Sequence, residues 1–148
     1  MTTRGARAVI AGLATAAIAA AGCGGGGPSE EEFTEQANAV CKRHYGEISA
    51  ATRKLLVRRD VPSPREFRRL GERTIVPEYR AQIRELRMVQ APDDKKNAYS
   101  AWLEDSDALA DDLRSHPALI IQEPKMLADV NDQADSLGLS TQCHIGPS

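Results

Sequence analysis

Apolar residues recur at intervals of three and four positions in four stretches of the chain, the spacing of one face of an α-helix. The first stretch begins after Ser29, which forms a capping box with the glutamate three positions later, and ends near Arg58. Its apolar face comprises Phe33, Ala37, Val40, Cys41, His44, Ile48, Ala51 and Leu55. No alternation of period two persists along the chain, so we expect no strand.

The second predicted helix begins at Ser63, with Pro64 at its first position, and continues to about Met88. Pro77 lies inside this stretch and lacks the N–H that an α-helix needs at that point. We therefore expect Pro77 to kink the helix or to split it in two.

The third and fourth predicted helices are also delimited by proline and glycine. The third follows the turn at 91–94 and ends at or before His116, because Pro117 comes next. The fourth runs from Pro124 to Gly138, which suits a left-handed C-terminal cap with Leu139 packing back on the helix.

Four amphipathic helices joined by short connections favour antiparallel packing between neighbours. We therefore predict an all-α fold, an antiparallel up-down-up-down four-helix bundle. The apolar stretches give the first three helices more than about 20 residues each and the fourth about 14. A chain of 148 residues has room for one such domain.

Residues 1–22 have the organisation of a secretory signal. Arg4 and Arg7 precede an apolar run of about 14 residues, which is shorter than the roughly 20 that a membrane span needs. The run ends in Ala20-Ala21-Gly22-Cys23, which resembles the cleavage site of bacterial lipoprotein signal peptides, with Ala20 where leucine is usual. The resemblance implies cleavage before Cys23 and attachment of acyl chains such as palmitate to that residue. The alternative is ordinary cleavage that leaves Cys23 unmodified.

This interpretation divides the chain into three parts. Residues 1–22 are a removed signal peptide, residues 23–29 a lipidated cysteine with a flexible Gly-rich tether, and residues 30–148 the helical domain. Two or three acyl chains would anchor the protein firmly, since one chain alone binds only marginally. We expect an extracytoplasmic protein, lipid-anchored to the outer face of the cell membrane.

Two cysteines, Cys41 and Cys143, remain for the helical domain. In an exported chain such a pair usually oxidises, so we predict a disulfide between them. One alternative is a zinc site, because His44 lies one helical turn from Cys41 and His144 is adjacent to Cys143. Free thiols are the third interpretation.

Charge is unevenly distributed along the chain. Residues 53–87 contain 11 basic and 5 acidic side chains, whereas residues from 93 onward contain 4 basic and 11 acidic ones. Basic residues of the second helix form an arginine stripe: Arg65, Arg69, Arg73, Arg80, Arg84 and Arg87. The stripe either pairs with acidic residues of the third helix or binds an anionic lipid headgroup or polymer of the cell envelope.

The apolar run 118–121 lies in a connection between helices, where polar residues are usual. It closes one end of the core or forms a docking patch for a partner protein.

No phosphate-binding loop, metalloprotease motif, calcium loop or nucleophile elbow is present in the sequence, so we predict no enzymatic activity and no cofactor. The formal net charge of −2 gives no reason to expect nucleic-acid binding.

Three segments resemble small helical lipoproteins of unknown function found in actinobacteria: residues 33–41, Ala91-Pro92 before a tyrosine-containing helix, and Leu137-Gly138-Leu139 shortly before Cys143. Pro117 and Pro124 depart from the smoother connection of such sequences. The resemblance agrees with a helical fold and paired cysteines and implies no activity.

We predict a non-catalytic binding or scaffolding module of the cell envelope. Its candidate partners are the membrane, through the N-terminal lipid, and an envelope protein or an anionic lipid or polymer. The alternative is a metal- or small-ligand-binding envelope protein that uses Cys41, His44, Cys143 and His144.

Overall fold

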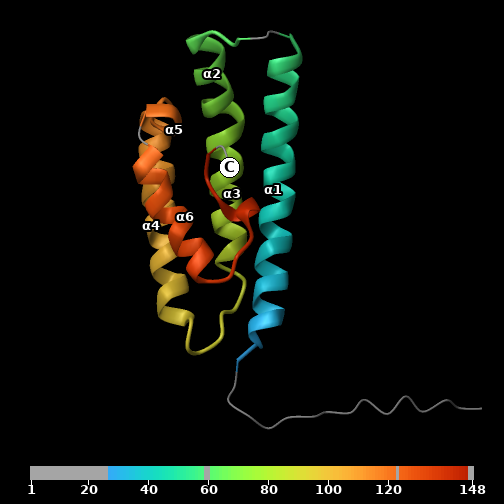
Figure 1. Cartoon of the computed structure of the whole chain (residues 1–148), viewed down its shortest axis with the longest axis vertical. Helices are drawn as coiled ribbons and strands as arrows, with labels where there is room; N and C mark the ends of the chain where they lie inside the picture. The colour runs from blue at the N-terminus through green and yellow to red at the C-terminus, as the bar shows by residue number, and fades with distance from the viewer. Residues whose placement is uncertain (1–26, 59–60, 123, 147–148) are drawn as a thin grey trace, which may run out of the picture.

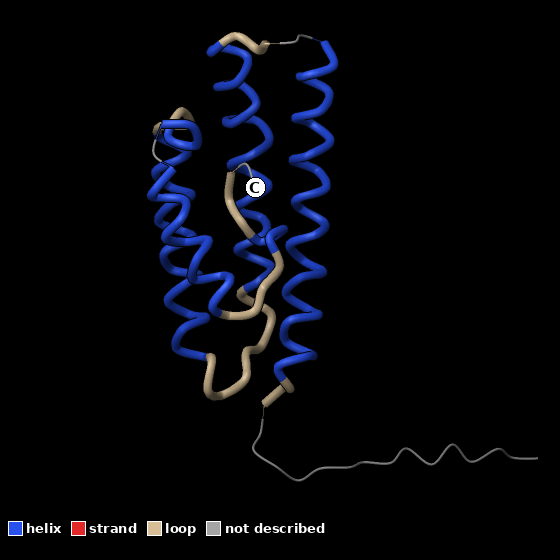
Figure 2. Tube along the Cα trace, in the orientation of Figure 1, coloured by secondary structure: helices blue, strands red, loops and turns tan. Residues whose placement is uncertain are grey.

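The computed structural model describes residues 27–58, 61–122 and 124–146, and this part of the chain is all-helical, without strands (Figure 2). The predicted signal peptide, Cys23 and most of the tether lie outside the described residues. Within the described residues, no helix combines the length and the apolar character needed to span a membrane. The long helices pack side by side as a helical bundle (Figure 1).

Helix α1 spans Glu30–Arg58 and begins at the predicted capping box. The backbone N–H of Ser29 donates to the Glu32 carboxylate at 2.9 Å, and the Glu32 N–H donates to the Ser29 hydroxyl at 3.2 Å. These two bonds satisfy donors that have no partner inside the helix. The Ser29 hydroxyl also donates to the Glu32 carboxylate, and this bond together with that from the Ser29 N–H holds the pKa of the Glu32 carboxyl below its usual range.

The second predicted helix is interrupted just before Pro77, as the sequence indicates. It consists of α2 (Pro64–Leu70), a π-helical turn η1 (Gly71–Ile75) and α3 (Val76–Leu86). In the π turn the Val76 N–H donates to the Gly71 carbonyl, five residues back. The wider turn suits the chain here because Pro77 has no N–H to continue the ordinary pattern.

The remaining helices are α4 (Lys96–Ser115), a single turn α5 (Leu119–Gln122), α6 (Pro124–Ser136) and a 3₁₀ turn η2 (Thr141–Cys143). Helix α4 ends before Pro117 as predicted, and its 20 residues make it shorter than expected. Gly138 has φ +79°, and the Leu139 and Gly138 N–H groups donate to the Ala134 and Asp135 carbonyls. This is the predicted left-handed cap.

Figure 1 shows the course of the chain. Helix α1 runs the full length of the molecule, α2 and α3 return beside it, and α4 and α6 lie together on the far side of α3. The segment after α6 crosses back to α1, where η2 packs against it. The ends of α1 and α2 extend beyond α4 and α5. The bundle is therefore thicker at one end than at the other.

We call the thicker part the closed half: residues 30–44 of α1, with α3, α4, α6 and η2. Its core is centred on aromatic residues, with the rings of Phe33 and Tyr99 edge to face at 4.9 Å and Trp102 5.7 Å from Tyr99. Burial raises the pKa of the Tyr79 and Tyr99 phenols, so both are neutral at physiological pH. The other part, residues 45–58 of α1 with α2 and η1, we call the open arm.

Candidate functional site

The open arm contains a groove of about 790 Å³, within the range of about 300–1,000 Å³ that is usual for small-molecule sites. It runs between α1 and the α2–η1 segment, and residues 144–146 form part of its wall. Its lining is mostly apolar, and none of the described residues that line it is acidic. The lining residues are Tyr45, Gly46, Ile48, Ser49, Thr52, Arg53, Phe67, Leu70, Ile75, Ile120, His144, Ile145 and Gly146.

The groove exists because the apolar face of α1 continues past the helices that cover it. Phe33 and Ala37 on this face are fully buried, whereas Ile48 and Leu55, further along, are only half-buried. In the closed half α1 packs against α3 and η2, whereas its upper part has, of the described elements, only α2 and η1 beside it, since the ends of α1 and α2 extend beyond α4 and α5 (Figure 1). Apolar side chains of the open arm, among them Ile48 and Phe67, therefore line an open groove.

The π turn and α5 close the lower end of the groove. Gly71 is buried, and a Cβ atom at this position would lie 3.0 Å from the Pro117 Cβ. Glycine thus permits the close approach of the connection after α4. Ile120 of α5 is 6% exposed and contributes to the groove lining. Part of the predicted apolar run therefore closes the core at the base of the groove.

The C-terminal wall of the groove is fixed by side-chain bonds. The Sγ atoms of Cys41 and Cys143 lie 2.12 Å apart, at disulfide distance, in agreement with the predicted pairing. The Ile145 N–H donates to the Asn131 side chain at 2.9 Å, and the Asn131 amide donates to the Ile145 carbonyl at 3.1 Å. Residues 144–146 are thereby held between α6 and α1.

The four residues of the zinc alternative do not form one ligand set. Cys41 and Cys143 are at disulfide distance, while His144 Nε2 lies 2.8 Å from Asp135 Oδ1. His44 is buried, with Nδ1 2.8 Å from Glu78 Oε2 and Nε2 3.2 Å from Glu85 Oε1. Among the described residues, no three His, Cys, Asp or Glu side chains are arranged to hold a metal ion.

His44 instead connects α1 to α3. Both ring nitrogens face carboxylate oxygens, and both can donate only when the imidazole is protonated. Arg43 pairs with Glu85 as well, so the contact is a small charge network. The apolar pattern of the predicted helices does not indicate these partners. The available signal was the spacing of Glu78 and Glu85, which are seven residues apart and therefore on one face of a helix.

The arginine stripe divides into two parts that behave differently. In the closed half, Arg80 pairs with Asp111 at 3.0 Å and Arg87 with Asp107 at 2.9 Å, both on α4. In the open arm, Arg65, Arg69 and Arg73 are exposed and make no ion pair with any described residue. Arg84 also has no such partner within the described part of the chain. Pairing with the acidic third helix thus applies to two of the six arginines.

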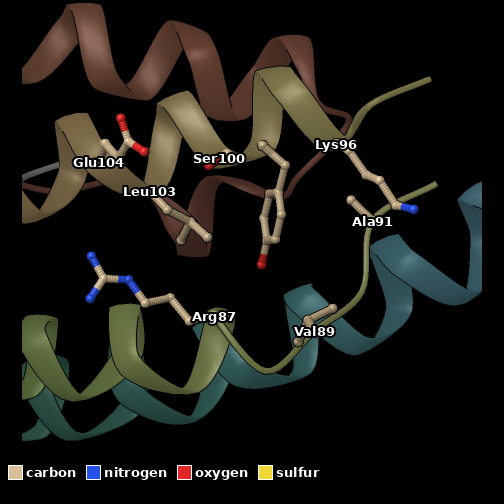
Figure 3. A pocket seen from close by; sticks show the side chains of 8 residues that line it. Arg87, Val89, Ala91, Lys96, Ser100, Leu103 and Glu104 are labelled. Atoms are coloured by element: carbon tan, nitrogen blue, oxygen red, sulfur yellow. The ribbon is translucent and has the colours of Figure 1, made fainter. Parts of the chain in front are cut away.

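A second cavity, of about 400 Å³, lies at the opposite end of the molecule, where the loop after α3 meets α4 (Figure 3). Arg87, Lys96 and Glu104 line it, so charges of both signs surround a small space. Arg87 is already paired with Asp107, and Lys96 with Asp93 at 2.5 Å. We therefore regard the larger apolar groove as the candidate site.

Comparison with known protein families, curated proteins and solved structures finds no match to this chain. The class of protein is therefore defined by its own fold and site. It is an all-helical bundle in which two distant cysteines pair and an apolar groove opens between two extended helices.

Proposed function

We propose that this protein is a non-catalytic binding module of the cell envelope that holds an apolar ligand in the groove of the open arm. In this proposal the chain is cleaved before Cys23, acylated there, and carried on the outer face of the membrane by its Gly-rich tether. The helical domain is an up-down-up-down four-helix bundle that extends away from the anchor. The observation that carries the proposal is the groove, which has mostly apolar walls and a volume of about 790 Å³.

The position of the groove fits a binding role. It begins at Tyr45, 15 residues after the first residue of α1, and thus about 23 Å along that helix from its N-terminus. An anchored domain would therefore present the groove above the membrane surface, where water favours the transfer of an apolar ligand into it.

The test is to fill the groove with a side chain. Gly46 lines it, and a Cβ atom there would meet no atom within 4 Å. Gly46→Phe should abolish the fluorescence of a polarity-sensitive apolar dye added to the full chain in lipid nanodiscs, measured above nanodiscs alone. The matched control is Glu47→Phe, because Glu47 is exposed and does not line the groove. Equal dye binding by wild type and Gly46→Phe would contradict the proposal.

The anchor is tested separately. Cys23→Ala should move the protein from the membrane fraction to the soluble fraction or leave it unprocessed, and mass spectrometry of the wild type should show acyl chains on an N-terminal Cys23. A wild-type chain that starts at Met1, or that carries an unmodified Cys23, would contradict lipid anchoring.

A further inference from the structure

The groove is mostly apolar and has a cationic side chain, Arg53, at one end, which restricts the chemistry of its ligand. Cys143 is bonded to Cys41, so residues 144–146 lie near the Tyr45 end of the groove. Arg53 lies eight residues beyond Tyr45 on α1, about 12 Å further along the helix. The groove thus has Ile145 and Ile120 at its base and a guanidinium group at its mouth.

Arg53 is the residue available to a ligand at this mouth. No described residue forms an ion pair with it, whereas His144, at the other end, is 2.8 Å from Asp135. No acidic side chain is found among the described groove residues. A ligand with a negative group near Arg53 would therefore meet attraction without a competing carboxylate in the groove.

The charge around the groove has the same sign. Residues 47–75 contain eight Lys or Arg and four Asp or Glu, a net charge of +4. Arg65, Arg69 and Arg73, which form no ion pair with a described residue, lie in this region. A positive surface attracts anionic ligands and weakens the binding of cationic ones.

We infer that the ligand of the groove is a single-chain anionic amphiphile, with its hydrocarbon chain between α1 and α2 and its acidic head group at Arg53. The inference rests on the proposed function and adds the ligand class. One chain fits a groove of this volume, and Arg53, the one Lys or Arg among the described lining residues, matches one head group. Each methylene group that enters the groove should strengthen binding about fourfold.

The experiment uses photoreactive amphiphiles of equal chain length that carry a carboxylate, an alcohol or a trimethylammonium head group. Each is titrated into the full chain in zwitterionic lipid nanodiscs and irradiated, and adducts are mapped by peptide mass spectrometry. Labelling of residues 45–53, 67–75 and 144–146 should half-saturate at about fivefold lower concentration for the carboxylate than for the alcohol, with the ammonium compound weakest.

Two variants locate the head group. Arg53→Gln should remove the preference for the carboxylate over the alcohol, while labelling by the alcohol stays unchanged. Lys54→Gln is the matched control, since Lys54 is exposed, adjacent and outside the groove lining. It should keep the preference. If both variants lost this preference equally, a general effect of surface charge would explain it in place of a contact with Arg53, and the inference would be overturned.

The outcomes separate this inference from the proposed function. Equal groove labelling by all three amphiphiles would overturn the anionic ligand and leave an apolar binding groove. Labelling of the groove by none of them would overturn both. Exclusion of every probe together with a doubled mass in native mass spectrometry would overturn the inference in favour of a second copy of the chain as the occupant.

Discussion

The closed half and the open arm are built on the same two helical segments, α1 and the α2–η1–α3 segment, and differ in what packs against them. In the closed half, the apolar face of α1 contacts α3 and η2, and its residues Phe33, Ala37 and Cys41 have no exposed surface. In the open arm, the same face continues through Ile48 and Leu55, and these side chains are half-buried. An apolar stripe therefore becomes core or groove according to the length of its neighbours.

The same difference applies to charge. Arg80 and Arg87 on α3 pair with α4, whereas Arg65, Arg69 and Arg73 on α2 and η1 form no ion pair with a described residue. Arg84 on α3 also lacks such a partner among the described residues. The closed half thus buries its apolar residues and pairs two of its arginines, while the open arm leaves residues of both kinds at least partly exposed. Five predictions test this division, from the largest expected effect to the smallest.

Removal of the crosslink should affect stability most. The disulfide joins residues separated by 102 positions, and a loop of this size restricts the unfolded chain strongly. The double variant Cys41→Ala, Cys143→Ala should lose about 3–5 kcal/mol of unfolding free energy in urea denaturation. Reductant should destabilise the wild type by a similar amount and leave the double variant unchanged. An effect of reductant on the double variant would show that the crosslink is not its target.

Two isoleucines on the α2–η1–α3 segment provide a matched pair. Ile83 in the closed half is 1% exposed, and Ile75 in the open arm is half-buried and lines the groove. Ile83→Ala should cost about 3 kcal/mol, because it leaves a cavity in a packed core. Ile75→Ala should cost about 1 kcal/mol, because water already reaches the site. Equal costs in urea denaturation would contradict the distinction between core and groove.

Two glycines should respond in opposite directions to alanine. Gly138 caps α6 with φ +79°, which an alanine adopts only with strain, so Gly138→Ala should destabilise the protein by about 1 kcal/mol. Gly46 lies inside α1 and faces open space, so Gly46→Ala should stabilise it by about 0.5–1 kcal/mol. Thermal unfolding measures both changes. A stabilised Gly138→Ala variant would contradict the cap.

Two arginines compare paired and unpaired positions of the stripe. Arg87→Gln removes the contact with Asp107 and should cost about 0.5 kcal/mol at low ionic strength, since both side chains are partly exposed. High salt should reduce this cost. Arg69→Gln should leave the unfolding free energy within about 0.3 kcal/mol of wild type. A larger loss for Arg69 than for Arg87 would place the stabilising contacts in the open arm.

The smallest effect concerns the start of α1. Because the backbone N–H and the hydroxyl of Ser29 hold the pKa of Glu32 below its usual range, the cap stabilises the fold at pH values above that range. Its contribution decreases as the pH falls through the lowered pKa, where the carboxyl becomes protonated. An NMR titration of the Glu32 carboxyl should give a midpoint below the ordinary value, and Ser29→Ala should raise it only part of the way, because the backbone N–H at position 29 still donates to the carboxylate. A midpoint at the ordinary value would contradict the bond between Ser29 and Glu32.

Much of the secondary structure followed from local signals. The helix boundaries at Ser29, Ser63, Pro117 and Gly138 depend on hydrogen bonds and φ angles within a few residues of each boundary, so the sequence predicts them. The pairing of Cys41 with Cys143 was also accessible, because two cysteines in a chain expected to be exported have one partner each. The apolar pattern overestimates the length of α4, which has 20 residues in the structure.

The sequence by itself determined which residues are helical, which faces are apolar and where the helices end, because these properties depend on neighbours along the chain. Only the tertiary structure decided which part of each face is covered. Ile48 and Phe33 belong to one stripe, and His44 meets Glu78 and Glu85 across 34 and 41 residues of sequence. Burial and pairing depend on contacts between distant segments, and the relative lengths and positions of four packed helices set those contacts.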